Sequence, residues 1–157
     1  MLNILLFEPE IPPNTGNIIR LCANAGAALH LIEPLGFDMS DKALKRAGLD
    51  YHEFANVQIH ADWKQFKQWY LDNSGDLTRI FGFSTKAVTL YSDVDYHDND
   101  VLMFGPESRG LPDVIREELG LEQLVILPMK AGSRSLNLSN STAIALYHAW
   151  FTLGFDQ

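Results

Sequence analysis

The sequence predicts a single α/β domain over residues 1–157, in which helices cover both faces of a parallel sheet. Two observations carry this prediction. Short apolar segments alternate with segments of helical spacing, an alternation typical of parallel sheets. The strand-like segments are also almost continuously apolar, as strands buried on both faces are. With 157 residues, 46% of them hydrophobic, the chain is long enough for one domain with its own core.

The first element is expected to be a strand over residues 2–7, a nearly unbroken apolar run. The prolines that follow it predict an extended loop. Asn14 can then cap a helix over residues 15–25, because its side chain can accept a hydrogen bond from the first helical turn. Gly26 can end that helix, since glycine readily adopts the left-handed conformation found after helices.

The middle of the chain predicts two strands and two helices. Residues 29–32 and, more weakly, 57–60 are the expected strands. Residues 41–47 form an expected short helix that Gly48 ends. A further helix around residues 63–70 is indicated by side chains at helical spacing, namely Trp63, Phe66, Lys67 and Tyr70.

The C-terminal half predicts strands over residues 79–83, 101–104 and 124–127. A short helix over residues 112–119 begins with a proline, a residue that is favoured in a first helical turn. The last expected helix, residues 139–153, is apolar on more than one face. Such a helix should pack against more than the sheet alone.

Composition and charge exclude several classes of protein. No apolar run approaches the roughly 20 residues of a membrane span. The N-terminus has neither the basic residues nor the cleavage site of a signal peptide. Cys22 is the single cysteine, which excludes an intramolecular disulfide. A net charge of −8 argues against strong non-specific binding to DNA or other polyanions. We therefore expect a cytoplasmic protein with no membrane or DNA partner.

No pattern in the sequence indicates a metal site. The histidines are scattered and show no Asp or Ser partner pattern, so they are interpreted as structural or surface residues. The aspartates between residues 93 and 100 lack the spacing of a calcium-binding loop. They predict a solvated loop instead.

Three loops that follow predicted strands are unusually rich in Gly, Asn, Ser and Pro. They span residues 8–17, 105–112 and 128–140. Parallel sheets bind ligands beyond the carboxyl ends of their strands, where these loops should meet. None of them carries a dinucleotide fingerprint or a P-loop, so the expected ligand is of another kind. Valine in place of Gly105 is expected to block such a site sterically while the fold survives.

The first loop with the helix after it, and the second loop, also admit a simpler interpretation. Asn17, Arg20 and Asn24 fall on one stripe of the first helix, which is the ordinary wet face of an amphipathic helix. Alternatively, Arg20 lies in a polar groove where its planar fork can hold a phosphate. The segment around Glu107 and Arg109 is either a tight turn or a backbone cradle in which one of these side chains fixes a flat ligand.

Taken together and in order, the three loops resemble the motifs of the SPOUT class of RNA methyltransferases. The first is Asn14-x-Gly-x-x-x-Arg20, the second covers residues 102–110, and the third covers residues 127–140. The resemblance runs nearly end to end, with further similarity at residues 32–37 and 47–54. It implies an α/β fold with a C-terminal trefoil knot, a homodimer, and S-adenosylmethionine (AdoMet) as cofactor.

The resemblance also implies roles for individual residues. Arg20 matches the arginine implicated in methyl transfer, and Tyr147 matches a tyrosine near the reacting end. A guanidinium is effectively always protonated, so we expect Arg20 to stabilise the developing alkoxide or to clamp a phosphate. Cofactor-contacting positions and their neighbours are Phe83, Gly105, Leu127, Met129, Ser135, Leu136 and Asn140. No metal is required.

Within that class, the chain is most similar to members that methylate the wobble ribose of tRNA. The similarity implies transfer of a methyl group to the 2'-hydroxyl of C34 or U34 in leucine tRNAs, with recognition centred on the anticodon stem-loop. Basic residues near the motif segments could serve that recognition: Arg20, Lys42, Lys45, Arg46, Arg109, Lys130 and Arg134. The alternatives are methylation of another tRNA or rRNA site, and a non-catalytic RNA-binding relative.

Overall fold

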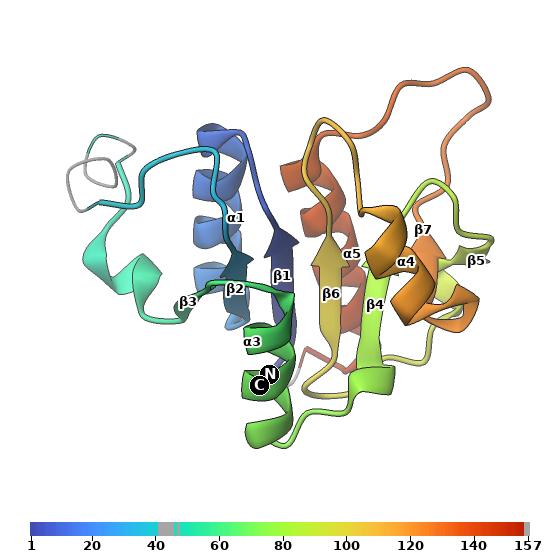
Figure 1. The fold of residues 1–157 in the computed structure, drawn as a ribbon, viewed down its shortest axis with the longest axis horizontal. Helices are drawn as coiled ribbons and strands as arrows, with labels where there is room; N and C mark the ends of the chain where they lie inside the picture. The colour runs from blue at the N-terminus through green and yellow to red at the C-terminus, as the bar shows by residue number, and fades with distance from the viewer. Residues whose placement is uncertain (41–45, 47, 156–157) are drawn as a thin grey trace.

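The computed structural model of the chain describes residues 1–40, 46 and 48–155. These residues form a seven-stranded sheet in the order β3-β2-β1-β6-β4-β7-β5, and every strand pair is parallel (Figure 1). The strands are β1 (Asn3–Phe7), β2 (Ala28–Ile32), β3 (Val57–His60), β4 (Ile80–Phe83), β5 (Thr89–Leu90), β6 (Val101–Phe104) and β7 (Leu124–Ile126). The predicted parallel α/β fold is thereby confirmed.

Helices cover both faces of the sheet, as the sequence predicts. Helices α1 (Pro12–Ala25) and α5 (Leu138–Thr152) pack on one face, and α3 (Trp63–Asp72) and α4 (Asp113–Leu119) pack on the other (Figure 1). Four 3-10 turns connect these elements: η1 (Tyr51–Phe54), η2 (Leu77–Arg79), η3 (Tyr91–Asp93) and η4 (Leu121–Gln123). The expected helix over residues 41–47 lies, except for Arg46, outside the described residues.

The two faces of the sheet bury separate cores, which explains why the strands read as continuous apolar runs. Side chains alternate between the faces of a strand. In β1, Ile4 and Leu6 therefore join the core beneath α1 and α5, while Leu5 and Phe7 join the core beneath α3 and α4. All five residues of β1 are buried.

Two helix starts differ from the prediction. Helix α1 begins at Pro12, after an Ile11 N-cap that makes no side-chain cap, so Asn14 lies inside the first turn rather than capping it. The proline supplies the start, because a first-turn residue needs no N–H partner. Helix α5 is capped by Asn137, whose side chain accepts from the backbone N–H groups of Ser139 and Asn140.

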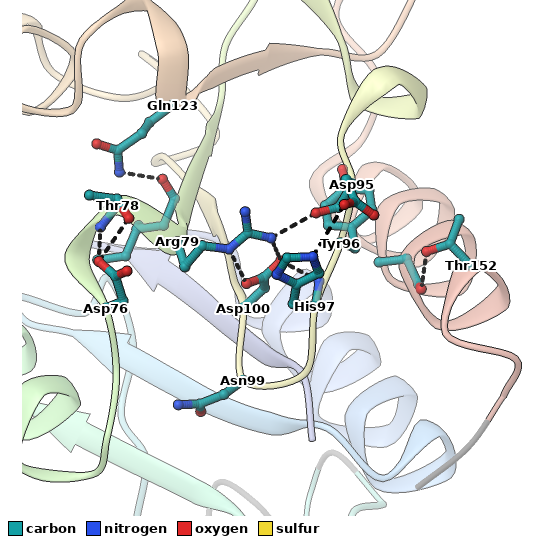
Figure 2. Close-up of polar contacts among 12 residues, drawn as sticks. Asp76, Thr78, Arg79, Asp95, Tyr96, His97, Asn99, Asp100, Gln123 and Thr152 are labelled. Atoms are coloured by element: carbon teal, nitrogen blue, oxygen red, sulfur yellow. Dashed lines mark hydrogen bonds and ion pairs between the residues drawn. The ribbon is translucent and has the colours of Figure 1, made fainter.

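The interpretation of the 93–100 segment as a solvated loop is wrong for Asp100. Its side chain is 1% exposed and forms a two-pronged ion pair with Arg79 (Figure 2). Arg79 Nε donates to Oδ1 at 2.8 Å and Nη2 donates to Oδ2 at 2.6 Å. The backbone N–H of His97 also donates to Asp100, at 2.8 Å. This ion pair joins the residues that immediately precede β4 and β6.

Two of the histidines form a buried pair, in line with the structural role expected of them. His30 Nδ1 and His60 Nε2 lie 3.0 Å apart, and His30 Nε2 lies 3.3 Å from Asn3 Oδ1. Because the Asn3 oxygen can only accept, His30 donates from Nε2 and accepts at Nδ1. The rings of Phe66 and Trp69 on α3 pack against both histidines.

Candidate active site

A cavity of about 710 Å³ opens at the carboxyl ends of β4, β6 and β7. Its walls come from the three loops that the sequence singled out, together with residues 83–86 that follow β4. The volume lies within the range of pockets that hold small molecules and cofactors. The edge of the sheet is also where parallel α/β folds bind their ligands.

Most of the residues predicted to contact a cofactor line this cavity. They are Phe83, Gly105, Leu127, Met129, Ser135 and Leu136. Asn140 is not among the lining residues, although its neighbour Ser141 is, and its backbone N–H donates to the Asn137 cap at 3.3 Å. Arg20 and Tyr147 also lie outside the lining of the cavity.

Gly105 is required by the loop itself. A Cβ atom at this position would lie 2.2 Å from the carbonyl carbon of Gly110 and 2.2 Å from the backbone nitrogen of Leu111. The loop closes through a 2.8 Å hydrogen bond from Gly110 N to Pro106 O. The steric overlap expected for valine at position 105 therefore falls within the protein, and that substitution would displace the wall of the cavity rather than fill it.

Glu107 ties the first and second loops together. Its Oε2 accepts from the backbone N–H of Glu10 at 2.8 Å, and its Oε1 accepts from the backbone N–H of Ile11 at 3.1 Å. The same Oε1 accepts from Asn14 Nδ2 at 3.3 Å. The carboxylate thus holds the start of α1, a role that differs from the ligand-fixing one considered in the sequence.

Asn14 extends this connection to the third loop. Its side-chain oxygen accepts from Asn137 Nδ2 at 2.9 Å, and Asn137 in turn caps α5. A continuous chain of hydrogen bonds, Glu107–Asn14–Asn137, therefore joins one residue from each loop. The sequence placed Asn14 and Asn137 in polar segments but gave no sign that they contact each other, because their partners lie far away along the chain.

Further contacts between the first two loops fix the rim of the cavity. Glu10 accepts from the backbone N–H of Ser108 at 2.9 Å and from its hydroxyl at 2.7 Å, which lowers the pKa of that carboxyl. Arg109 forms an ion pair with Glu8. Glu8 has a φ of 48°, a conformation that costs free energy for a residue other than glycine and often occurs near functional sites.

Arg20 lies on the exposed stripe of α1 that the sequence predicted, together with Asn17 and Asn24. Its guanidinium is not solvated freely, however. Nε donates to Glu53 Oε1 at 3.0 Å, and Nη2 donates to the carbonyl oxygen of Gly48 at 3.0 Å. The arginine is thus held by η1 and the residues before it.

Helix α5 exposes an unusually apolar outer face. Ile144, Tyr147, Phe151 and, just beyond the helix, Phe155 are each more than two-fifths exposed. Tyr147 meets Trp150 edge-on, with ring centroids 5.5 Å apart. A contiguous apolar face on a helix that already packs against the sheet and α1 is typical of an interaction surface.

Comparison with known proteins assigns this chain to a family. Residues 1–147 match the model of the SpoU rRNA Methylase family. The chain belongs to this family. The resemblance to SPOUT methyltransferases drawn from the three motifs is thereby confirmed, and with it the assignment as a methyltransferase.

Individual relatives match over nearly the whole chain. A tRNA (cytidine(34)-2'-O)-methyltransferase from Yersinia pestis is 55% identical, over 99% of this chain and 96% of the relative. A solved structure described as giving insights into the 2-OH methylation of C/U34 on tRNA has a TM-score of 0.85 at 38% identity, over 99% of this chain and 98% of the other. An AdoMet-bound rRNA methyltransferase from Sinorhizobium meliloti has a TM-score of 0.79 at 26% identity, over 97% of this chain and 56% of the other.

The basic residues expected to contact RNA are exposed where the structure describes them. Lys130 and Arg134 lie on the exposed third loop, and Arg46 is also exposed, while Lys42 and Lys45 lie outside the described residues.

Within the described part of the chain, no cluster of three or more His, Cys, Asp or Glu side chains could hold a metal ion. In that same part, no helix is long and apolar enough to cross a membrane. The trefoil knot that the SpoU family implies stays a prediction.

Proposed function

We propose that residues 1–157 form one methyltransferase domain that transfers a methyl group from AdoMet to the ribose 2'-hydroxyl of the wobble nucleotide, C34 or U34, of leucine tRNAs. The observation that carries this proposal is the 710 Å³ cavity at the junction of the three motif loops. It is supported by a relative with this wobble-position activity that is 55% identical over almost its full length.

The chemistry of the cavity lining suits AdoMet, which combines an apolar ring face with charged and hydrogen-bonding groups. Apolar contacts are available from Phe83, Leu127, Met129 and Leu136, and a hydroxyl from Ser135. The close approach of Gly105 to the backbone of residues 110–111 gives one wall made of peptide groups, which can bond the polar edge of a base. When bound there, AdoMet supplies a methyl group on a sulfonium that is ready for attack by an oxygen.

The residues of the chain then have to position the ribose and stabilise its charge. The 2'-hydroxyl loses a proton during the reaction, and a fixed guanidinium can stabilise the oxyanion that develops. We assign this role to Arg20, either directly or through the adjacent phosphate. Arg20 remains protonated throughout, so the proton passes to a phosphate oxygen or to water. Tyr147 is assigned to the reacting end of the same site.

We further propose that the enzyme is a homodimer in which the outer face of α5 is covered by a second copy. Arg20 lies about 9 Å along α1 from Asn14, at about 1.5 Å per residue, and does not line the cavity of its own chain. A shared site, with Arg20 of one copy facing the cavity of the other, accounts for this separation. It also covers the exposed rings of Tyr147 and Phe151. Active monomers in sedimentation at nanomolar concentration would contradict it.

Recognition of the tRNA is expected to be local, and we expect the enzyme to act on it in the cytoplasm. A chain of net charge −8 cannot coat a whole tRNA, whereas a few basic residues can hold the splayed nucleotides of the anticodon loop. A minimal anticodon stem-loop should therefore bind nearly as well as full-length tRNA. Affinity should fall with a shallow slope against the logarithm of salt concentration. A steep slope, or loss of binding to the stem-loop, would point to other parts of the tRNA.

Methyl incorporation from labelled AdoMet, followed by nucleoside mass mapping, tests the proposed function. Leucine tRNAs from cells lacking the protein should carry an unmethylated ribose at position 34, and the purified enzyme should restore the methyl group. Methylation at another nucleotide would favour another RNA site. AdoMet binding without incorporation into any RNA would indicate a non-catalytic RNA-binding relative.

A further inference from the structure

The ion pair between Arg20 and Glu53 has an unusual division of exposure. The Glu53 side chain is 21% exposed, whereas the Arg20 side chain is 51% exposed. The carboxylate is therefore the fixed partner, and the guanidinium extends from it toward the solvent. An ordinary surface pair, with both side chains in water, contributes little and holds neither partner in place.

Glu53 is fixed by a second contact. Its Oε2 accepts from the backbone N–H of Asp50 at 2.7 Å, while its Oε1 accepts from Arg20 Nε at 3.0 Å. One carboxylate thus connects η1, the turn before it, and helix α1. The hydrogen bond from the Asp50 backbone, and then the one from the Arg20 side chain, lower the pKa of the Glu53 carboxyl, which keeps it charged.

The Arg20 guanidinium is also held at a second point. Nη2 donates to the carbonyl oxygen of Gly48 at 3.0 Å. A guanidinium has five N–H donors in a rigid plane. Within the described part of the chain, its hydrogen bonds to Glu53 and Gly48 use two of the five donors. Three donors are left, one on Nη2 and both on Nη1. Two fixed contacts on a planar group set the direction in which the remaining donors point.

We propose that Glu53 is a positioning residue for methyl transfer: with the carbonyl of Gly48 it holds the Arg20 guanidinium in one orientation, so that the free N–H groups face the RNA oxygens. The inference rests on the proposed function, since it gives Arg20 a partner in that reaction. Loss of the carboxylate releases a long side chain with many rotamers. Misplacement of a catalytic group by about 1 Å can cost about 100-fold in rate.

Glu53→Gln is the direct test, because glutamine keeps the size of the side chain but offers one accepting oxygen instead of two. In the same position, the NH2 group of glutamine would face one of the two donors, Arg20 Nε–H or Asp50 N–H, and could not accept from it. We expect kcat for methylation of an anticodon stem-loop to fall about 10- to 100-fold, with little change in KM for AdoMet or in Tm. Glu118→Gln is the matched control, since Glu118 pairs with Lys67 on the opposite face of the sheet and should retain full kcat.

A double-mutant cycle separates positioning from a general structural effect. In an Arg20→Ala background, Glu53→Gln should cause no further loss of kcat, because the group that it positions is gone. Additive losses in the cycle, or unchanged kcat in Glu53→Gln alone, would overturn the inference while leaving the proposed function intact.

A spectroscopic measurement keeps the inference testable even if the unchanged protein methylates no RNA, in which case the proposed function fails. In ¹⁵N NMR, the Nε–H signal of Arg20 should be sharp and protected from exchange in the unchanged protein. Glu53→Gln should broaden that signal and speed its exchange. An unaltered Arg20 signal in the variant would show that Glu53 does not hold the guanidinium.

Discussion

The two ends of the sheet are both rich in polar side chains, yet they are organised in opposite ways. At the amino-terminal ends of the strands, Asp100 is 1% exposed and its oxygens are occupied by Arg79 and by the backbone of His97. Arg79 in turn donates to the carbonyl of Asp95, which closes the network (Figure 2). Polar groups at this end take partners from their own chain.

At the carboxyl ends, the hydrogen bonds that link Glu107, Asn14 and Asn137 join three loops without filling the space between them. The result is a cavity of about 710 Å³. Polar density in a sequence therefore does not distinguish a ligand site from a structural network. Polar groups bond one another at both ends, and what distinguishes the ends is whether those groups also surround a space that another molecule can occupy.

The largest expected effect comes from Arg20→Ala, a change to a proposed catalytic residue on α1. We expect methylation to fall about 100- to 1,000-fold, since a fixed charge partner of the transition state is lost. Affinity for AdoMet, measured by calorimetry, should stay nearly unchanged because Arg20 does not line the cavity. Arg20→Lys should restore activity only in part, as an ammonium lacks the planar fork. Activity within a few-fold of the unchanged enzyme would assign Arg20 to the solvated face of α1.

Asp100→Asn should instead affect stability and spare the site. The substitution removes the charged partner of Arg79, and hydrogen bonds to charged groups contribute about 1.5–3 kcal/mol. We expect the free energy of unfolding in urea to fall by about 2 kcal/mol, with AdoMet affinity unchanged for the folded protein. A large loss of AdoMet affinity in the folded variant would show that the two ends of the sheet are coupled.

Leu127→Trp tests whether the cavity holds the cofactor. The half-buried Leu127 lines the cavity at the end of β7, so the added ring can occupy the space assigned to the cofactor. AdoMet affinity should fall about tenfold, which corresponds to about 1.4 kcal/mol, while Tm changes little. Undiminished affinity would move the cofactor to another part of the chain.

The buried pair of His30, in the middle of β2, and His60, at the end of β3, makes the stability of the fold sensitive to pH. Burial, and then the neighbouring His60, lower the pKa of His30 to about 3 from 6.5. Below about pH 6.5, His30 therefore takes up a proton in the unfolded chain but stays neutral in the folded protein. We therefore expect the contribution of His30 to stability to be full above pH 6.5 and to fall by about 1.4 kcal/mol per pH unit as pH drops toward 3.

Urea unfolding between pH 7.5 and 5 measures this dependence. His30→Met removes the titrating ring, so the slope of stability against pH should become shallower in that variant. Because neither His30 nor His60 lines the cavity, AdoMet affinity of the folded protein should not follow the same profile. An identical slope in His30→Met would assign the pH dependence to other groups.

The sequence by itself determined the architecture and the edge of the sheet at which the three motif loops meet. The apolar runs of the strands reflect burial on both faces, which any parallel sheet with two helical layers requires. The loops of Gly, Asn, Ser and Pro follow strands, and the carboxyl ends of parallel strands meet at one edge. For this reason six of the seven predicted cofactor residues line one cavity.

Only the tertiary structure decided which polar groups are partners. Asn14 has the local preference of a helix cap, yet its side chain bonds Glu107 and Asn137, which are 93 and 123 residues away in sequence. Asp100 looked solvated because its partner, Arg79, is 21 residues away in sequence. Strand β5 consists of two residues that are a strand only through pairing with β7. Local propensity acts between neighbours along the chain, whereas the choice of a hydrogen-bond partner depends on which groups the completed fold brings within about 3 Å.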